Sequence, residues 1–493
     1  MTDMRIRLAT LIAVVLNFWV SAAWAQQSQP SAGSSTLPPQ STATQPPTQT
    51  VANAPSTAQD VNQRGELEMP ALSSGIVLQP GSQESSTSYF LPSLEWTGFF
   101  NQTIAQAPTV SGTVTQSIYV GDIVLQHIRK HSQLNLDYAG GAQSYGSSYL
   151  NNSSAIPPGW GTIQRLSFVG TLRSRQLQFT VGDQGMYLPE SPYGYSGFSG
   201  LQSFGAGSGG AFLGNQAQVN QLLSPSESIL TGNSRHYVNT GLAELQFTPT
   251  ARSTFTVTGS SGITHFLDSG FVNSRTAALM AGYNLRLTRR DEISVTYIHF
   301  RFTFDTANQG ILERGFLLAY GHQFSPRLSL SLSAGPVQNE LAQPQGGNVK
   351  QVFWTTDNSL RYRARFADFA GSFARYTTPG SGVLSGAETD WASLSAGRPI
   401  IGRLRGSLEA GHAYNQSVRP QANAALKSQY ETWQGGVTLS HEYGKHTSLY
   451  AQYQFQYQIA SNPTCFLGGC RIYNERHMLG GGINWHGQPI RMR

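Results

Sequence analysis

The stretch from Ser448 to Ala460, SLYAQYQFQYQIA, separates apolar and polar side chains into two interleaved sets. One set is Leu449, Ala451, Tyr453, Phe455, Tyr457 and Ile459, and the other is Gln452, Gln454, Gln456 and Gln458. Because successive side chains of a β-strand point to opposite faces, the pattern predicts a strand with one apolar and one amide-lined face. A soluble sheet would need helices to cover the apolar face, and the chain has few candidate helices. A closed membrane barrel instead turns the apolar face to lipid and the polar face to a wet lumen.

The same two-residue period continues from about Ser93 to the C-terminal part of the chain. Gln133 and Asn135, for example, alternate with Leu134 and Leu136. Segments with this period lie at about 93–106, 116–129, 132–146, 161–173, 175–187, 236–249, 251–265, 273–288, 291–305, 311–324, 326–339, 350–366, 367–378, 388–400, 402–416, 428–443, 445–460 and 472–486. They predict an all-β fold, a transmembrane antiparallel up-and-down barrel of about 16–18 strands.

In one segment the alternation of apolar and polar residues is interrupted. Its apolar residues change parity in the middle, from Ile293, Val295 and Tyr297 to Ile298, Phe300, Phe302 and Phe304. We therefore expect a β-bulge near Tyr297, which would keep all of these side chains on the apolar face.

The predicted connections alternate in length. Every second one is tight, and these turns lie around Lys130, Ser174, Thr250, Arg290, Ser325, Phe366, Gly402 and Gly444. Short periplasmic turns and longer external loops are typical of bacterial barrels, so both termini are expected in the periplasm. Strands that descend toward the periplasm end in aromatic residues on the apolar parity, namely Phe247, Phe324, Phe366, Tyr443 and Trp485. An aromatic girdle at the membrane interface has this form.

Composition agrees with a membrane protein built from strands. Only 12% of the 493 residues are charged, and a hydrophobic content of 39% is too low for a helical membrane protein. The net charge of +6 is not gathered into Lys/Arg runs, so we expect no nucleic-acid partner.

The N-terminal part of the chain lacks the strand pattern. Residues 1–25 combine two arginines, a short apolar run and Ala23-Trp24-Ala25, which predicts a cleaved secretory signal peptide. Residues 26–90 are rich in Gln, Ser, Thr and Pro, a composition that predicts a disordered periplasmic linker. Residues 91–493 are left for the barrel.

In its alternating strands, uneven connections and aromatic strand ends, the chain resembles the porins of Gram-negative outer membranes. The resemblance is architectural, covers about residues 93–486 and matches no specific family. In porins the third external loop folds into the barrel and narrows the pore. The third external loop here, 188–235, is the longest, but it lacks the acidic motif of general porins, and the last strand ends near Trp485 instead of a terminal Phe. The resemblance implies a constriction that its aromatic residues would line: Tyr193, Tyr195, Phe198, Phe204 and Phe212.

Those loop aromatics have two interpretations. They would stack on sugar rings if the loop enters the lumen, or they would pack the loop upon itself.

Charged residues on the polar parity are candidates for lining the pore. The arginines are Arg165, Arg286, Arg301, Arg361, Arg363, Arg365, Arg403 and Arg405, and the clearest inward acids are Asp137, Glu244 and Glu409. Because these arginines outnumber the acids, the lumen would concentrate anions and discriminate by charge. The alternative is that the arginines lie near the periplasmic ends and contact only turns or headgroups.

No catalytic motif is convincing. Gly205, Gly207 and Gly210 match GxGxxG, but no strand precedes them and no helix follows. Ser440 and His441 are adjacent and therefore project to opposite faces of a strand.

The remaining candidates for chemistry are histidines and cysteines. His299, His412 and His477 are scattered and show no consistent acidic partner in the sequence. Cys465 and Cys470 are expected to form a disulfide across an external loop. We expect no metal, no cofactor and no enzymatic activity.

These features predict a channel in the cell outer membrane for passive diffusion of small polar or anionic solutes. Three alternatives stay open: a barrel that exports a surface polysaccharide, an outer-membrane hydrolase, and a structural or adhesion barrel. The expected partners are outer-membrane lipid, small solutes or an acidic polysaccharide, and the barrel-assembly machinery. The sequence leaves the question of a homo-oligomer open.

Overall fold

The structure is a computed structural model that describes residues 88–105, 110–146, 148–150, 153–156, 159–188, 235–267, 272–305, 310–342, 347–379, 384–418, 429–462 and 470–492. The predictions made for the signal peptide, for nearly all of the linker, for the aromatic residues of the 188–235 loop and for the Cys465–Cys470 disulfide lie outside the described residues. Within the described ranges, no helix has the length and apolar character that a membrane span requires.

The described residues form one antiparallel β-sheet. Its strands are β1 (Tyr89–Ala105), β2 (Val110–Arg129), β3 (Ser132–Tyr145), β4 (Ser148–Leu150), β5 (Ser153–Ile156), β6 (Gly159–Arg173), β7 (Leu177–Leu188), β8 (His236–Thr250), β9 (Ser253–Phe266), β10 (Ser274–Arg286), β11 (Asp291–Phe304), β12 (Gly310–Ser325), β13 (Leu328–Ala342), β14 (Asn348–Arg363), β15 (Asp368–Thr378), β16 (Ala387–Ile401), β17 (Leu404–Ser417), β18 (Gln429–Tyr443), β19 (Thr447–Asn462), β20 (Cys470–His486) and β21 (Ile490–Arg491).

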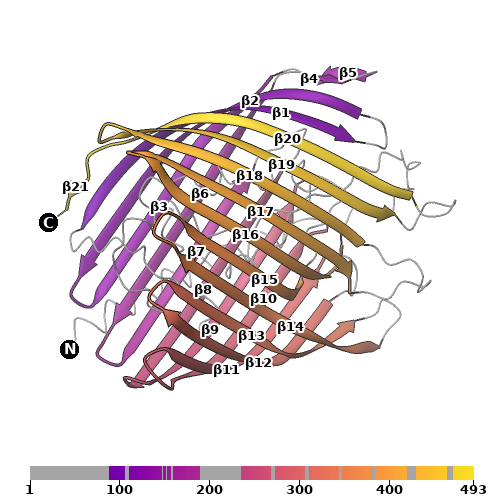
Figure 1. Cartoon of the computed structure of the whole chain (residues 1–493). Coiled ribbons are helices and arrows are strands. Elements are labelled where there is room, and N and C mark those ends of the chain that lie inside the picture. The colour runs from indigo at the N-terminus through magenta and orange to yellow at the C-terminus, as the bar shows by residue number, and fades with distance from the viewer. Residues whose placement is uncertain are drawn as a thin grey trace, which may run out of the picture. The chain divides into compact units, whose positions relative to one another are not determined.

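Eighteen of these strands, β1–β3 and β6–β20, follow one another around a closed barrel (Figure 1). The barrel closes where β1 pairs with β20, from Ser93 opposite His486 to Ala105 opposite Asn474. We call this line of contact the seam. The all-β barrel predicted from the sequence is therefore confirmed.

Three short strands lie beside the wall and were not predicted. β4 and β5 form a hairpin, and β4 pairs with β2 through Leu150, opposite Gly112. After β20 the chain turns back, and β21 pairs with the start of β1 through Arg491, opposite Tyr89.

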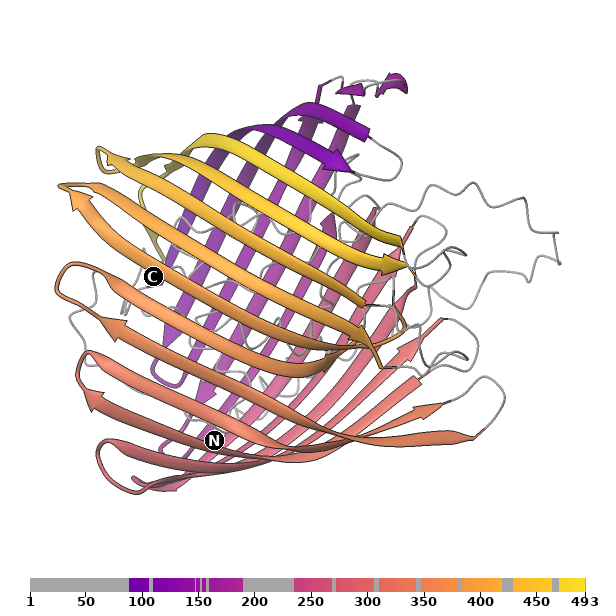
Figure 2. The same cartoon turned by 45° about the vertical axis from the view of Figure 1, so that its right-hand side comes forward.

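Eight tight connections gather at one rim of the barrel, which we call the tight-turn rim (Figure 2). They span 130–131, 174–176, 251–252, 287–290, 326–327, 364–367, 402–403 and 444–446. Gly402 and Gly444 adopt φ angles of 56° and 77°, which glycine tolerates better than other residues. The start of β1 and the end of β20 lie at the same rim, so the predicted alternation of tight and longer connections is confirmed.

The two parities of each strand differ in exposure. On β19, Gln452 and Gln458 are 5% and 0% exposed, whereas Leu449 and Tyr453 are 40% and 41% exposed. Because the inner face of a closed barrel is the more enclosed one, the buried parity points inward and the exposed apolar parity points outward. The predicted girdle residues are all exposed near the tight-turn rim: Phe247, Phe324, Phe366, Tyr443 and Trp485.

The bulge predicted near Tyr297 is wrong. The register of β11 with both of its neighbours continues without a shift through Tyr297. Phe300 and Phe302 consequently point inward, and each is 2% exposed. They belong to an inner apolar cluster with Met280, Ile298, Phe304, Ile311, Val337 and Leu341, among others. Burial against one another, instead of contact with lipid, accounts for the apolar character of these positions.

A second group of inward apolar side chains lies near the seam and consists of Phe99, Ile118, Val120, Ala139, Ile163 and Met478. The interior wall is therefore divided into apolar and polar sectors. The sequence predicted a polar inner face. The strands instead present both apolar and polar side chains to the interior.

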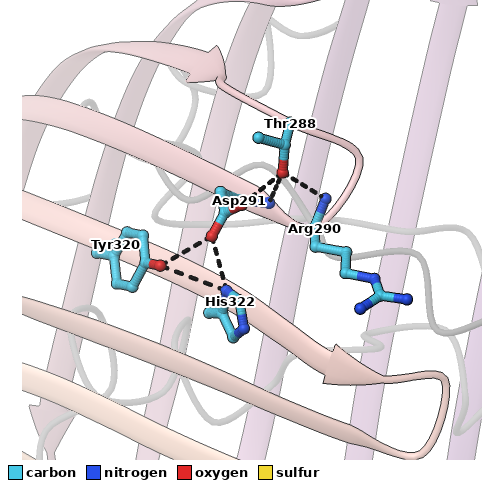
Figure 3. A network of polar contacts seen from close by, with 5 residues as sticks. All are labelled: Thr288, Arg290, Asp291, Tyr320 and His322. Atoms are coloured by element: carbon cyan, nitrogen blue, oxygen red, sulfur yellow. Dashed lines mark hydrogen bonds and ion pairs between the residues drawn. The ribbon is translucent and has the colours of Figure 1, made fainter.

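A hydrogen-bond network on the outer face fastens one tight turn to the next strand (Figure 3). The carboxylate of Asp291 accepts hydrogen bonds from the Thr288 hydroxyl at 2.5 Å and the Tyr320 hydroxyl at 2.8 Å, and it lies 2.7 Å from Nδ1 of His322. The Thr288 hydroxyl also accepts from the backbone N–H groups of Arg290 and Asp291. The 287–290 turn is thereby tied to β12.

Candidate functional site in the barrel interior

Three carboxylates face the interior from consecutive strands next to the seam. Glu95 on β1, Asp122 on β2 and Asp137 on β3 are 8%, 4% and 5% exposed. Their strands place them there because the flanking residues, such as Leu94 and Trp96 on β1, point outward. Asp137 was predicted as an inward acid, whereas Glu95 and Asp122 were not, although the same alternation identifies both.

One arginine is paired with one of these acids. Arg165 on β6 donates from Nη2 to both carboxylate oxygens of Asp137, at 3.2 and 3.3 Å. Asp122 accepts a hydrogen bond from the Ser93 hydroxyl at 3.2 Å, and its Oδ1 atom has no partner in the described part of the chain. Two carboxylates beside a single guanidinium make this sector of the interior acidic.

The third acid, Glu95, joins strands across the seam. The Tyr450 hydroxyl on β19 donates to its Oε1 atom at 2.5 Å and also contacts the Thr97 hydroxyl. Asn484 on β20 donates to the other oxygen at 3.4 Å. These contacts fix the side chain of an acid at the place where the barrel closes.

Amide side chains are the second component of the interior. Gln143 on β3, Gln434 on β18 and Gln458 on β19 each bury both amide atoms, and neither atom has a hydrogen-bond partner among the described residues. Shielded polar groups in proteins are nearly always paired with protein or water. These three amides therefore need a partner that the described part of the wall does not supply.

The structure places the predicted pore residues as follows. On the inward parity lie Arg165, Arg286, Arg361, Arg363, Arg405 and Glu244. Arg365 and Arg403 are exposed residues of the tight turns, and the side chain of Glu409 is outside the description. Glu244 is 7% exposed and accepts a hydrogen bond from Thr258 at 3.4 Å.

Arg301 is the exception, and its prediction as an inward residue is wrong. It shares the outward parity of β11 with Val295, which is 50% exposed. The reason is the continuous register through Tyr297, because a bulge there would have reversed the parity of the residues that follow.

The inward arginines near the tight-turn rim are partly balanced by acids. Arg363 lies 3.4 Å from Asp368, and Arg405 lies 3.5 Å from Glu442. Further inward acids, which the sequence analysis did not include, are Glu95, Asp122, Glu292, Glu313 and Asp357. The expectation that inward arginines outnumber inward acids is therefore wrong, and the interior carries both signs.

Two histidines on the outer face have acidic partners that the sequence did not indicate. Nε2 of His412 lies 2.9 Å from Glu431, and Nε2 of His477 lies 3.0 Å from Glu475. Neither histidine bonds a serine or threonine hydroxyl within the described ranges, so they do not form a nucleophilic dyad there. The same ranges contain no cluster of three or more His, Cys, Asp or Glu placed to hold a metal ion.

The sequence matches no protein-family model and no curated protein. Among solved structures it is similar to Pseudomonas aeruginosa OccK7 (OpdD), with 10% identity, a TM-score of 0.42 and coverage of 81% of this chain and 99% of that one. It is also similar to the BenF-like porin from Pseudomonas fluorescens Pf-5, with 9% identity, a TM-score of 0.42 and coverage of 82% and 99%. For Acinetobacter baumannii OccAB3 the values are 9%, 0.42, 81% and 99%. On the evidence of its own strands, the described part of the chain forms a closed antiparallel barrel of eighteen strands.

Proposed function

We propose that the barrel is an outer-membrane channel through which small polar solutes, anions among them, pass by diffusion. One observation carries this proposal: the outer face is apolar, while inward amides such as those of Gln143, Gln434 and Gln458 have no hydrogen-bond partner among the described residues. Such an outer face suits acyl chains, and such an inner face needs water. A barrel of about eighteen strands is wide enough for an aqueous path. Passage of this kind needs no covalent step.

The inward charges set the preferred sign of the solute in this proposal. Arg361 and Arg405 lie near the tight-turn rim, and Asp122 and Asp137 lie further along their strands beside Arg165. Charges act strongly across a narrow lumen, because separations there are comparable with the Debye length of about 8 Å at physiological salt. The rim arginines therefore favour anions, and the acids near the seam oppose that preference.

Planar-bilayer recording tests both parts of the proposal. The full chain, reconstituted into a lipid bilayer, is expected to open ion-conducting channels, and the reversal potential in a KCl gradient reports the ratio of anion to cation permeability. Replacing both Arg361→Gln and Arg405→Gln should shift this ratio toward cations. Replacing both Asp122→Asn and Asp137→Asn should shift it toward anions.

Lys350→Gln is the matched control. Lys350 lies on β14, as Arg361 does, but on the outward parity, so its replacement should leave the reversal potential unchanged. If the reconstituted barrel passes no ions, the proposal that it is a channel is contradicted. Equal shifts in the control and in the arginine variant would contradict the role of the inward charges.

A further inference from the structure

Three exposed arginines form a diagonal row on the outer face, close to the rim opposite the tight turns. Arg275, Arg301 and Arg314 lie on the consecutive strands β10, β11 and β12. In the register, Arg301 is opposite Ala277 and Leu312, each two residues from the arginine of the neighbouring strand. Such diagonal neighbours are about 7–8 Å apart, so two long guanidinium side chains can reach one ligand between them.

The row marks the edge of the outward apolar band. Toward the tight turns, the same face presents Leu279, Phe316 and Leu318, with exposures of 46%, 59% and 64%. Charged side chains at the end of such a band lie at the depth of lipid headgroups, because acyl chains exclude them. If the tight turns are periplasmic, as in bacterial barrels, these headgroups belong to the outer leaflet.

The three arginines of the row outnumber the two outward acids beside them, Asp305 and Glu340. Arg301 and Arg314 form no ion pair with any acid in the described ranges. The outward acids Asp305 and Glu340 lie diagonally beside Arg275 and Arg314 and accept hydrogen bonds from asparagines, at 2.9 and 2.5 Å, which leave their negative charges in place. Adjacent like charges on one sheet face repel each other, and an anion bound between them would remove that cost.

We infer that Arg301 and Arg314, with Arg275 beside them, bind a phosphorylated lipid of the outer leaflet. Arginine suits this ligand because its planar guanidinium donates two parallel hydrogen bonds to phosphate oxygens. The acyl chains of the same lipid would lie on the apolar residues next to the row. This inference goes beyond transport and rests on the barrel crossing the outer membrane with its tight turns in the periplasm.

Native mass spectrometry of the full chain in neutral detergent, titrated with bis-phosphorylated lipid A, tests the inference. The double variant Arg301→Gln, Arg314→Gln is expected to weaken binding by about tenfold or more, since charge-assisted contacts to phosphate are the strong ones. The control is Arg252→Gln, Arg289→Gln, which removes the same charge from exposed turns at the other rim and should bind as the unaltered chain does. Because all of these side chains are exposed, the variants should fold, and the single variants Arg301→Gln and Arg314→Gln replace the double one if it does not.

Two further binding measurements identify the chemical group that the arginines recognise. Lipid A without its phosphates should bind the unaltered chain and the double variant equally, and inorganic phosphate should not displace the phosphorylated lipid. The inference is overturned if the double variant retains its affinity, if the dephosphorylated lipid shows the same loss, or if inorganic phosphate competes, which would indicate a site for free anions.

Discussion

Asp137 and Arg165 form an ion pair in the acidic sector of the barrel interior. Their side chains are only 7% and 12% exposed, and Asp122 lies nearby with a single hydrogen-bond donor. Removing one member of an enclosed ion pair leaves the other charge without compensation, which costs more than the pair itself contributes.

Arg165→Met should therefore lower the free energy of unfolding by about 3–5 kcal/mol, because it leaves the enclosed carboxylate of Asp137 without a counter-charge. Adding Asp137→Asn to this variant should restore most of the loss, since the unpaired charge is then gone. Urea unfolding of the barrel in lipid vesicles, followed by tryptophan fluorescence, measures both. Two losses that simply add would show that the residues do not interact in the folded barrel.

At this scale the sequence predicted only part of the site. Arg165, Arg361 and Glu244 are found on the inward parity because their strands keep a regular alternation. Arg301 was misplaced because the neighbouring phenylalanines were assumed to face lipid. Charges such as Glu95 could have been placed by parity alone, but their partners could not, since Tyr450 is distant in the chain and meets Glu95 only when the barrel closes.

Strand β11 shows what decides whether the apolar side chains of a strand face lipid or the barrel interior. Apolar side chains on a barrel strand have two destinations, lipid outside or an apolar sector inside, and period-two alternation does not distinguish them. Contact of all these side chains with lipid would need a bulge, whereas β11 keeps its register and buries Phe300 inside. The strands and tight turns themselves were predictable, because each depends on alternation and turn residues within one short segment.

Phenylalanine-to-alanine replacements on adjacent strands separate these two destinations. Phe300→Ala should cost about 3–5 kcal/mol, because it empties a packed site in the inner apolar cluster. Phe316→Ala on β12 is the matched control. Its ring is 59% exposed on the outer face, where lipid can fill the space that it leaves, so its cost should be less than half as large. Equal costs in urea unfolding would argue that Phe300 also faces lipid.

At the scale of the whole barrel, both proposals require one arrangement, in which lipid surrounds the outer face and water fills the interior. The closed sheet, the girdle near the tight-turn rim and the inward amides of Gln143, Gln434 and Gln458, which lack a partner among the described residues, all agree with it. The two inner apolar clusters cover part of the inner wall, and the row of glutamines on β19 and the acids at the seam leave other parts of it polar. Channel activity and lipid binding both presuppose this arrangement.

Spin labels along β19 test it most directly. Single cysteines replacing Ala451, Gln452, Tyr453 and Gln454, in a chain whose two native cysteines are changed to serine, would carry the labels in reconstituted vesicles. The account predicts that collision with oxygen, which concentrates in lipid, is high at 451 and 453, whereas collision with a water-soluble nickel chelate is high at 452 and 454. Accessibility that does not alternate between neighbouring positions, or chelate access at all four, would contradict it.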